Sequence, residues 1–450
     1  MTRRTAPYVV VGGGPAAAAA TRVIAQAGGQ VVLITEEPEQ PYDRTSLSKQ
    51  VLLDPDAEPP PLWDPSERRP DRVEILTGTS VVRIDPGART VHTSDGDTVG
   101  YDRLLLATGA RPRTLDLPGL PGSGVHHLRV SADARALRAD LHRAGPLVVI
   151  GGGVLGLEVA AAAIGGRQVR VVEAGSRILG RGIPAPVATR LAQVHREHGV
   201  NLLTGVAPVS IERSTEHVAG HATGHSTGRS APRSAGRPGD AGAAGGFVSG
   251  VRLSDGERLP AAVVVVAVGI APREELARDS GIATADGILV DSSCRTDVPG
   301  VWAAGDVARM RVPGHPGGLR FEAFTVAQNQ GVVAARSMLG EQVGDDQVPF
   351  TWSDQYGLTL QHVGLGTPGA EQVSLIDGEG EGEAVLVLEL EGDRLVAACG
   401  LGRGSLVPRA IRAAQRLIGR GGRIEVEALR EQQGDLDAVV RLLRSPASPG

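Results

Sequence analysis

Two complete dinucleotide-binding fingerprints occur in this chain, each made of a strand, a glycine-rich turn, a helix and a second strand ending in an acid. The first turn is GGGPAA at 12–17, with its acid at Glu36; the second is GGGVLG at 151–156, with its acid at Glu173. Glycines permit the tight bend and the close approach of a pyrophosphate, while the acid accepts hydrogen bonds from a ribose. A βαβ unit with incidental glycines is the alternative for either turn alone. Two turns in full context predict two dinucleotide sites.

The spacing of further glycine turns predicts an interrupted first domain. Apolar strands end in LATGARP at 106–112 and in VGIAP at 268–272, where the chain could cross between domains. We therefore expect an α/β fold with two interleaved Rossmann-like domains and a C-terminal α+β domain. The predicted limits are 1–113 with 272–345 for the first, 114–271 for the second and 346–450 for the third.

Residues 214–246 differ from the rest of the chain. They are rich in Gly, Ser, Thr, Ala, His and Arg without apolar periodicity, which is typical of a flexible insertion, here within a hairpin of the second domain. His217, His221 and His225 recur every four residues. Without nearby acids or cysteines in a ligand pattern, they are interpreted as solvated loop histidines and not as a metal site.

Composition excludes several classes of protein. The net charge of -5 is atypical of a dedicated nucleic-acid binder, and the longest apolar run, at 261–268, is too short to cross a membrane. The two cysteines, Cys294 and Cys399, lie too far apart in sequence for a CxxC site, and we expect both to be packing residues. The N-terminal sequence runs directly into a strand, so we expect a cytoplasmic protein.

Several segments together resemble the FAD-dependent, NAD(P)H-linked ferredoxin reductases of bacterial oxygenase systems, which share a glutathione-reductase-like fold with apoptosis-inducing factor. The resemblance covers nearly the whole chain except 214–246. It rests on GGGPAA, PYDRTSLSK at 41–49, LATGARPR, GGGVLGLEVA, AVGIAP, VWAAGDVA, FEAFTVAQNQG and TWSDQYG. Departures occur at Thr45 and Ser46, where the family usually has two prolines, and at Phe324, where it often has tryptophan. They imply a change in flavin potential or access, or neutral drift.

The resemblance implies two cofactors, FAD and NADH, with NADPH disfavoured because a 2′-phosphate would meet the charge of Glu173. It also implies three residues at the reacting centre: Lys49, the only lysine among 46 basic residues, Glu158, and Trp352, for which a core tryptophan is the alternative. The remaining residues implied to bind a cofactor are Gly12, Gly14, Pro15, Ala16, Glu36, Arg44, Ala107, Thr108, Gly109, Arg111, Gly151, Gly153, Gly156, Glu173, Gly269, Gly305, Asp306 and Glu322.

The implied activity is hydride transfer from NADH to FAD, followed by transfer of single electrons to a ferredoxin-type iron–sulfur protein that feeds an oxygenase. The absence of cysteine from 36–50 disfavours a disulfide substrate. Two alternatives stay open: a flavoenzyme acting directly on a small molecule, and a redox-sensing interaction protein. We expect no nucleic-acid or membrane partner, and a monomer or homodimer.

Overall fold

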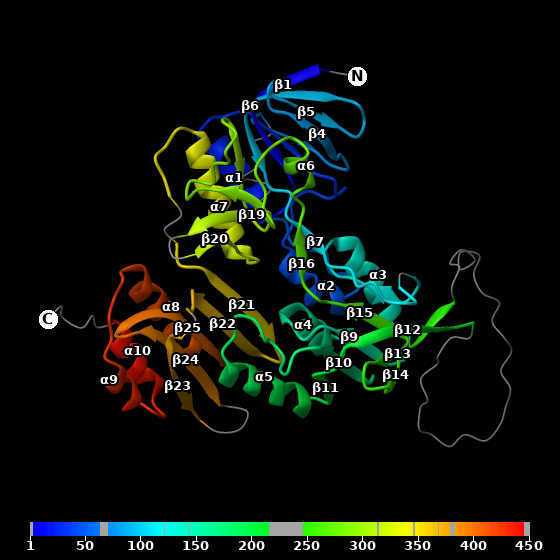
Figure 1. The fold of residues 1–450 in the computed structure, drawn as a ribbon, viewed down its shortest axis with the longest axis vertical. Coiled ribbons are helices and arrows are strands. Elements are labelled where there is room, and N and C mark those ends of the chain that lie inside the picture. The colour runs from blue at the N-terminus through cyan, green and yellow to red at the C-terminus, as the bar shows by residue number, and fades with distance from the viewer. Residues whose placement is uncertain are drawn as a thin grey trace.

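The computed structural model describes residues 3–63, 71–120, 122–143, 145–215, 246–312, 315–344, 347–367, 369–378 and 383–444. Most of the predicted insertion, with His217, His221 and His225, lies outside these ranges. Mixed α/β structure with parallel sheets, followed by an antiparallel C-terminal sheet, confirms the predicted fold class (Figure 1).

The first sheet has seven strands in the order β3-β2-β1-β6-β5-β4, with β18 beside β6. Helices α1 (Pro15–Gln26) and α7 (Phe324–Met338) pack against each other beside it. They approach closely because α7 has a glycine, Gly331, at the contact. A Cβ at this position would lie only 2.2 Å from the carbonyl oxygen of Ala16. The strands are β1 (Arg3–Val11), β2 (Val31–Ile34), β3 (Val73–Leu76), β4 (Val81–Asp85), β5 (Thr90–Thr93), β6 (Thr98–Leu106) and β18 (Val301–Ala303).

The second sheet is parallel throughout, with the order β11-β10-β9-β15-β8. Strands β9 and β15 at its centre are fully buried valine, leucine and isoleucine runs, as expected for a parallel sheet covered on both faces. The elements are β8 (Val125–His126), α3 (Ser131–Leu141), β9 (Leu147–Ile150), α4 (Val154–Ala162), β10 (Val169–Glu173), α5 (Ala185–Glu197), β11 (Val200–Thr204) and β15 (Val263–Val266).

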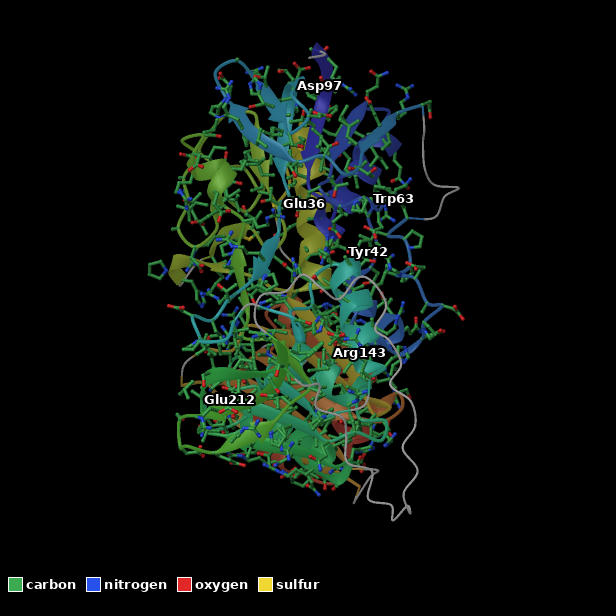
Figure 2. All side chains as sticks on the ribbon, turned by 90° about the vertical axis from the view of Figure 1, so that its right-hand side faces the viewer. Glu36, Tyr42, Trp63, Asp97, Arg143 and Glu212 are labelled. Carbon is green, nitrogen blue, oxygen red and sulfur yellow. The ribbon has the colours of Figure 1, made fainter. Side chains whose placement is uncertain are left out.

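The chain passes between these two sheets through adjacent segments. Strand β7 (Ala110–Pro112) pairs antiparallel with β16 (Ile270–Pro272), so the two glycine–proline turns noted in the sequence lie side by side. Strand β18 then rejoins the first sheet beside β6, in line with an interrupted first domain; the exact domain limits stay a prediction. Tyr42 links the two parts, because its hydroxyl accepts a hydrogen bond from the backbone of Ser131 at 2.8 Å. Figure 2 shows Tyr42 at mid-height of the molecule.

Smaller elements complete these two parts. The insertion joins β12 (Pro208–Ser214) to β13 (Phe247–Leu253), which pair antiparallel, so the predicted hairpin is present. The other elements are η1 (Arg44–Ser46), α2 (Gln50–Leu53), β14 (Arg258–Pro260), α6 (Glu275–Arg278), β17 (Ile288–Val290), β19 (Ala308–Val312) and β20 (His315–Arg320).

The C-terminal sheet is antiparallel, in the order β21-β22-β25-β24-β23. Helices α8 (Leu406–Gly419) and α10 (Leu436–Arg444) pack on it, and the short α9 (Val426–Arg430) lies near β23. Leu358, Leu360 and Val387 of the sheet share a core cluster with α4 and α5, so the sheet is covered by helices from two parts of the chain (Figure 1). The strands are β21 (Phe350–Gln355), β22 (Leu358–Gly364), β23 (Glu371–Asp377), β24 (Ala384–Glu391) and β25 (Arg394–Gly402).

Candidate functional site

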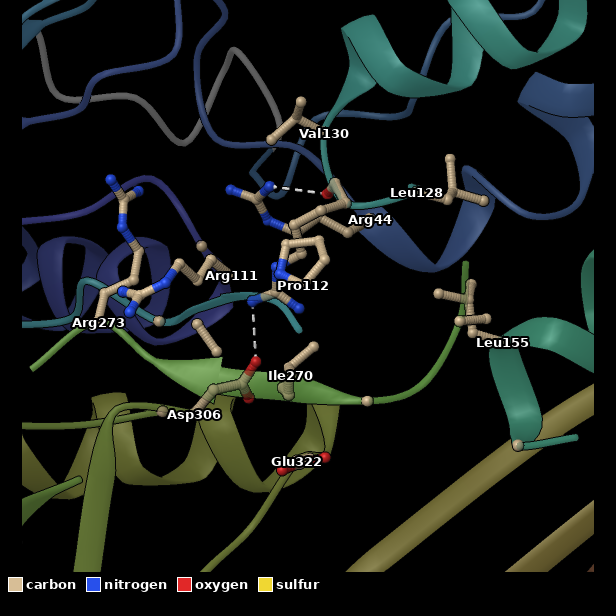
Figure 3. Close-up of a pocket in the computed structure, with 18 of the residues that line it drawn as sticks. Arg44, Arg111, Pro112, Leu128, Val130, Leu155, Ile270, Arg273, Asp306 and Glu322 are labelled. Atoms are coloured by element: carbon tan, nitrogen blue, oxygen red, sulfur yellow. Dashed lines mark hydrogen bonds and ion pairs between the residues drawn. The ribbon is translucent and has the colours of Figure 1, made fainter. Parts of the chain in front are cut away.

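One cavity of about 1780 Å³ reaches both glycine turns and the C-terminal sheet. It collects every site residue expected from the sequence except Gly156, although these residues come from all three parts of the chain; Figure 3 shows part of its lining. The lining residues from that set are Gly12, Gly14, Pro15, Ala16, Glu36, Arg44, Lys49, Ala107, Thr108, Gly109, Arg111, Gly151, Gly153, Glu158, Glu173, Gly269, Gly305, Asp306, Glu322 and Trp352.

The first glycine turn forms an open cradle at the start of α1. Gly12 has a φ of 128°, and a Cβ there would lie 2.1 Å from the carbonyl oxygen of Ala107, so only glycine fits. At Gly14, which caps the helix, a Cβ would meet nothing within 4 Å. The N-terminus of α1 therefore opens into the cavity, with Gly14, Pro15 and Ala16 in its lining, as a pyrophosphate requires.

The second turn repeats this geometry at the start of α4. Gly151 has a φ of 109° and a Cβ would lie 2.4 Å from the carbonyl oxygen of Ala267, while Gly153 faces open space. Gly156 lies behind the turn: a Cβ there would lie 2.1 Å from the carbonyl oxygen of Gly151. Gly156 therefore packs the helix closely on the turn and does not line the cavity, and its predicted part in binding the dinucleotide stays a prediction.

The acids that end the two fingerprints have different partners. Glu173 accepts hydrogen bonds from the backbone of Gly152 at 2.8 Å and of Gly175 at 2.7 Å, which fixes it at the rim of the second turn. Glu36 forms an ion pair with Arg273, whose Nη2 lies 2.8 Å from Oε2, and this hydrogen bond lowers the pKa of Glu36. Arg273 was not expected from the sequence; it follows the β16 crossing directly.

Basic residues gather beside Asp306. Arg129 donates to Asp306 at 2.9 Å, and Arg44 donates to the backbone oxygen of Arg129 at 3.2 Å (Figure 3). Arg44 also forms an ion pair with Glu37. Arg129 was missed in the sequence because it stands before α3 outside any motif. Its position depends on the packing of α3 against the first part of the chain.

Lys49, Glu158 and Trp352 lie at the junction with the C-terminal sheet. Lys49 Nζ lies 3.4 Å from Glu158 Oε1 and 3.9 Å from Asp354 Oδ2. The Glu158 carboxylate is only 8% exposed and accepts hydrogen bonds from the Ser353 hydroxyl at 2.6 Å and from that of Ser48. Lys49 and two hydroxyls thus compensate the burial of this carboxylate.

The departures from the family pattern have local structural roles. Thr45 donates to Asp43 at 2.7 Å, and Ser46 donates to the backbone oxygen of the same residue at 2.7 Å, so both hydroxyls stabilise the short helix η1. Phe324 packs edge-to-face on Trp352, with ring centroids 5.9 Å apart. Thr45 and Phe324 also line the cavity.

Cysteine takes no part in this cavity. Both cysteines of the chain are buried, form no disulfide and lie outside the cavity lining. Burial raises the pKa of the Cys399 thiol and so disfavours its reactive thiolate. Within the described ranges no group of three potential ligands could hold a metal ion. No helix in those ranges is long and apolar enough to cross a membrane.

Comparison with known proteins decides the family. The family model for pyridine nucleotide-disulphide oxidoreductases matches residues 6–331. The chain belongs to this family. A second model, for the reductase C-terminal domain, matches residues 350–440, so the resemblance noted in the sequence is confirmed.

Relatives cover almost the full chain. It is 37% identical over 398 residues to the anthranilate 1,2-dioxygenase system ferredoxin–NAD(+) reductase component of Burkholderia cepacia, covering 88% of this chain and 89% of the relative. It is 33% identical over 418 residues to rhodocoxin reductase of Rhodococcus erythropolis, covering 92% and 88%. Among solved structures, the covalent putidaredoxin reductase–putidaredoxin complex is similar with a TM-score of 0.82, 28% identity and coverage of 98% and 99%.

Proposed function

We propose that this member of the family is an FAD-dependent NADH:ferredoxin reductase that passes electrons to a ferredoxin-type iron–sulfur protein serving an oxygenase. The observation that carries the proposal is the single cavity into which two helix N-termini open, with the Lys49–Glu158 pair at its C-terminal wall and no cysteine in its lining. Two dinucleotides can approach each other there, whereas a disulfide substrate would lack its exchange partner.

The cavity fits FAD at the first glycine turn. Gly12 and Gly14 leave space for a pyrophosphate at the start of α1, and Arg44 and Arg129 supply positive charge nearby. Asp306 is already oriented by Arg129 and can accept hydrogen bonds from hydroxyl groups of the cofactor. Bound FAD supplies the redox chemistry, accepting a hydride and releasing single electrons.

The second turn suits NADH. Gly151 and Gly153 leave space for the second pyrophosphate, and Glu173 is held by two backbone N–H groups at the strand end where a ribose would lie. Its carboxylate accepts hydrogen bonds from ribose hydroxyls and repels a 2′-phosphate. Lys49 presents an ammonium group to the cavity, where it can stabilise negative charge on the reduced cofactor.

The acceptor is assigned from the relatives, which are named as ferredoxin–NAD(+) reductase components of dioxygenase systems. A cytoplasmic location remains part of the proposal, supported by two buried cysteines that form no disulfide. The domain limits 1–113 with 272–345, 114–271 and 346–450, the roles of the individual site residues, and a monomeric or homodimeric state are proposed on the same basis.

Anaerobic stopped-flow absorbance tests this function. We expect NADH to bleach the flavin of the purified holoenzyme faster than NADPH does, and a [2Fe–2S] ferredoxin to restore the oxidised spectrum. Rapid bleaching without reoxidation by ferredoxin would favour direct action on a small molecule. Slow bleaching with a change of conformation would favour the redox-sensing alternative, and no bleaching by either nucleotide would overturn the reductase assignment.

A further inference from the structure

A chain of polar side chains, buried except for the part-buried Tyr356, reaches Glu158 from behind, on the side away from the cavity. It begins at Tyr356 and His195 and runs through Gln355 and Ser353 to the carboxylate. Its hydrogen bonds join Tyr356 Oη to His195 Nδ1 at 3.0 Å, His195 Nε2 to Gln355 Oε1 at 2.8 Å, Gln355 Nε2 to Ser353 Oγ at 3.0 Å, and Ser353 Oγ to Glu158 Oε1 at 2.6 Å.

These hydrogen-bonded side chains lie in a largely apolar contact between α4, α5 and the C-terminal sheet (Figure 1). His195 is 0% exposed, Ser353 is 1% exposed and Gln355 is 5% exposed. Leu358 and Leu360 of the paired strand β22 surround the same layer. Buried polar groups in such a layer are costly unless every one is satisfied, so their presence needs a reason beyond packing.

Every hydrogen bond in the chain has the same direction. The Gln355 oxygen faces Nε2 of His195, so Nε2 carries the hydrogen and Nδ1 accepts from the Tyr356 hydroxyl. The Gln355 amide then donates to Ser353, which leaves the Ser353 hydroxyl hydrogen free to point at Glu158. The four donors thus follow one another toward Glu158, where Ser353 donates to the carboxylate oxygen, and each hydrogen bond strengthens the next.

The Gln355 amide in the middle determines whether these hydrogen-bonded side chains can transfer a proton. A neutral amide donates and accepts hydrogen bonds but does not pass a proton along at ordinary pH. Gln355 therefore interrupts any proton path between His195 and Glu158. What remains is orientation: the Ser353 hydroxyl cannot rotate away from Glu158 while Gln355 occupies its acceptor side.

We propose that Gln355 and His195 are positioning residues which, through Ser353, hold the Glu158 carboxylate in the orientation that pairs it with Lys49. The inference rests on the proposed function, because it assigns these residues to the reductive step. Glu158 and Lys49 come from the two parts that carry the glycine turns, whereas Ser353 and Gln355 come from β21. The C-terminal domain thereby sets the geometry of the pair.

Gln355→Leu is the test variant, since it keeps the side-chain size and removes both hydrogen bonds. In stopped flow with the FAD-loaded enzyme, we expect the limiting rate of flavin reduction by NADH to fall about 10-fold, with the NADH concentration for half-maximal rate nearly unchanged. His195→Phe should show a smaller loss in the same direction. Gln193→Leu, the same chemical change at an exposed site of α5, is the matched control and should behave as wild type.

A double-mutant cycle shows whether the effect passes through Glu158. Gln355→Leu combined with Glu158→Gln should be no slower than Glu158→Gln alone. The midpoint potential of the bound flavin, measured by dye equilibration without NADH, should rise in Gln355→Leu, because the Lys49 charge is less well compensated. It should rise no further when Gln355→Leu is added to Glu158→Gln.

Independent changes in the reduction rate and in the midpoint potential across the cycle would overturn the proposal, and so would wild-type behaviour of Gln355→Leu. If Gln355→Leu loses FAD, two variants at Ser353 test the proposal instead. Ser353→Ala should reduce the flavin slowly, whereas Ser353→Thr, which keeps the hydroxyl, should recover most of the rate. Equal rates for these two would also overturn it. A wild-type enzyme that NADH cannot reduce would instead refute the proposed function.

Discussion

His195 gives this protein a sensitivity to acid that can be calculated. Its imidazole is fully buried beneath the C-terminal sheet, and this desolvation lowers its pKa to about 4; nearby His198 acts in the same direction, while the hydrogen bond to Gln355 opposes it. Tyr356 faces its other nitrogen. In the unfolded chain an exposed histidine has a pKa of ~6.5.

The direction of the pH effect on stability follows from whether the folded or the unfolded chain binds a proton at His195 first. As the pH falls below ~6.5 the unfolded chain protonates at this site while the folded chain stays neutral, so the free energy of unfolding decreases until the pH passes the folded value. One pKa unit corresponds to about 1.4 kcal/mol, so the full loss is about 3 kcal/mol, of which about 2 kcal/mol is reached at pH ~5. The stabilising contribution is fully present above pH ~6.5.

Urea unfolding of the FAD-loaded protein at neutral pH and near pH 5 measures this effect. Other groups also contribute to the loss of stability in acid. They include the carboxylates and His362, because burial lowers the pKa of His362 as well. The informative quantity is therefore the difference between wild type and His195→Gln. We expect the variant to lose about 2 kcal/mol less on acidification, although it starts out less stable. Equal losses in both proteins would refute the reasoning.

Three further predictions concern the cavity and the packing behind it. Lys49→Arg should reduce the rate of flavin reduction about 10-fold with FAD content retained, because a guanidinium is larger than the ammonium held near Glu158; stopped flow measures the rate. Glu173→Ser should lower the preference for NADH over NADPH by about 10-fold or more, since the carboxylate that repels a 2′-phosphate is removed; the ratio of kcat/KM values measures it. Gly331→Ala should lower the free energy of unfolding by about 2 kcal/mol and weaken FAD retention, because the new Cβ would lie 2.2 Å from the Ala16 carbonyl oxygen. Thermal melting and flavin content measure these effects. Gly165→Ala, where a Cβ would meet nothing within 4 Å, is the control.

The sequence predicted the cavity well because its main determinants are local. Gly12 and Gly151 are needed for a positive φ and a close backbone contact within one βαβ unit, and such requirements are written in consecutive residues. Lys49 stood out because arginine fills every other basic position. In the structure this lysine lies beside Glu158, a contact between segments more than a hundred residues apart.

The residues that were missed depend on tertiary packing. Arg129 and Arg273 stand next to ordinary strands and helices, and their partners Asp306 and Glu36 are distant in the chain. His195 lies on a helix with a normal apolar face, where a histidine carries no signal of its own. Gly156 illustrates a related point, because a fingerprint position can serve helix packing as well as ligand contact; its predicted part in cofactor binding stays a prediction.

Strand β21 explains how one segment can serve both the cavity and the buried chain. Side chains alternate across a strand, so Ser353 and Gln355 face α4 and α5, while Trp352 and Asp354 lie on the opposite side. Lys49 reaches the edge of this strand, 3.4 Å from Glu158 on one side and 3.9 Å from Asp354 on the other. A slip of one residue against β22 would exchange the two sides, driving Trp352 into the helices and removing the donor from Glu158. The register that pairs Trp352 with Gln361 is therefore itself a requirement of the proposed reductase.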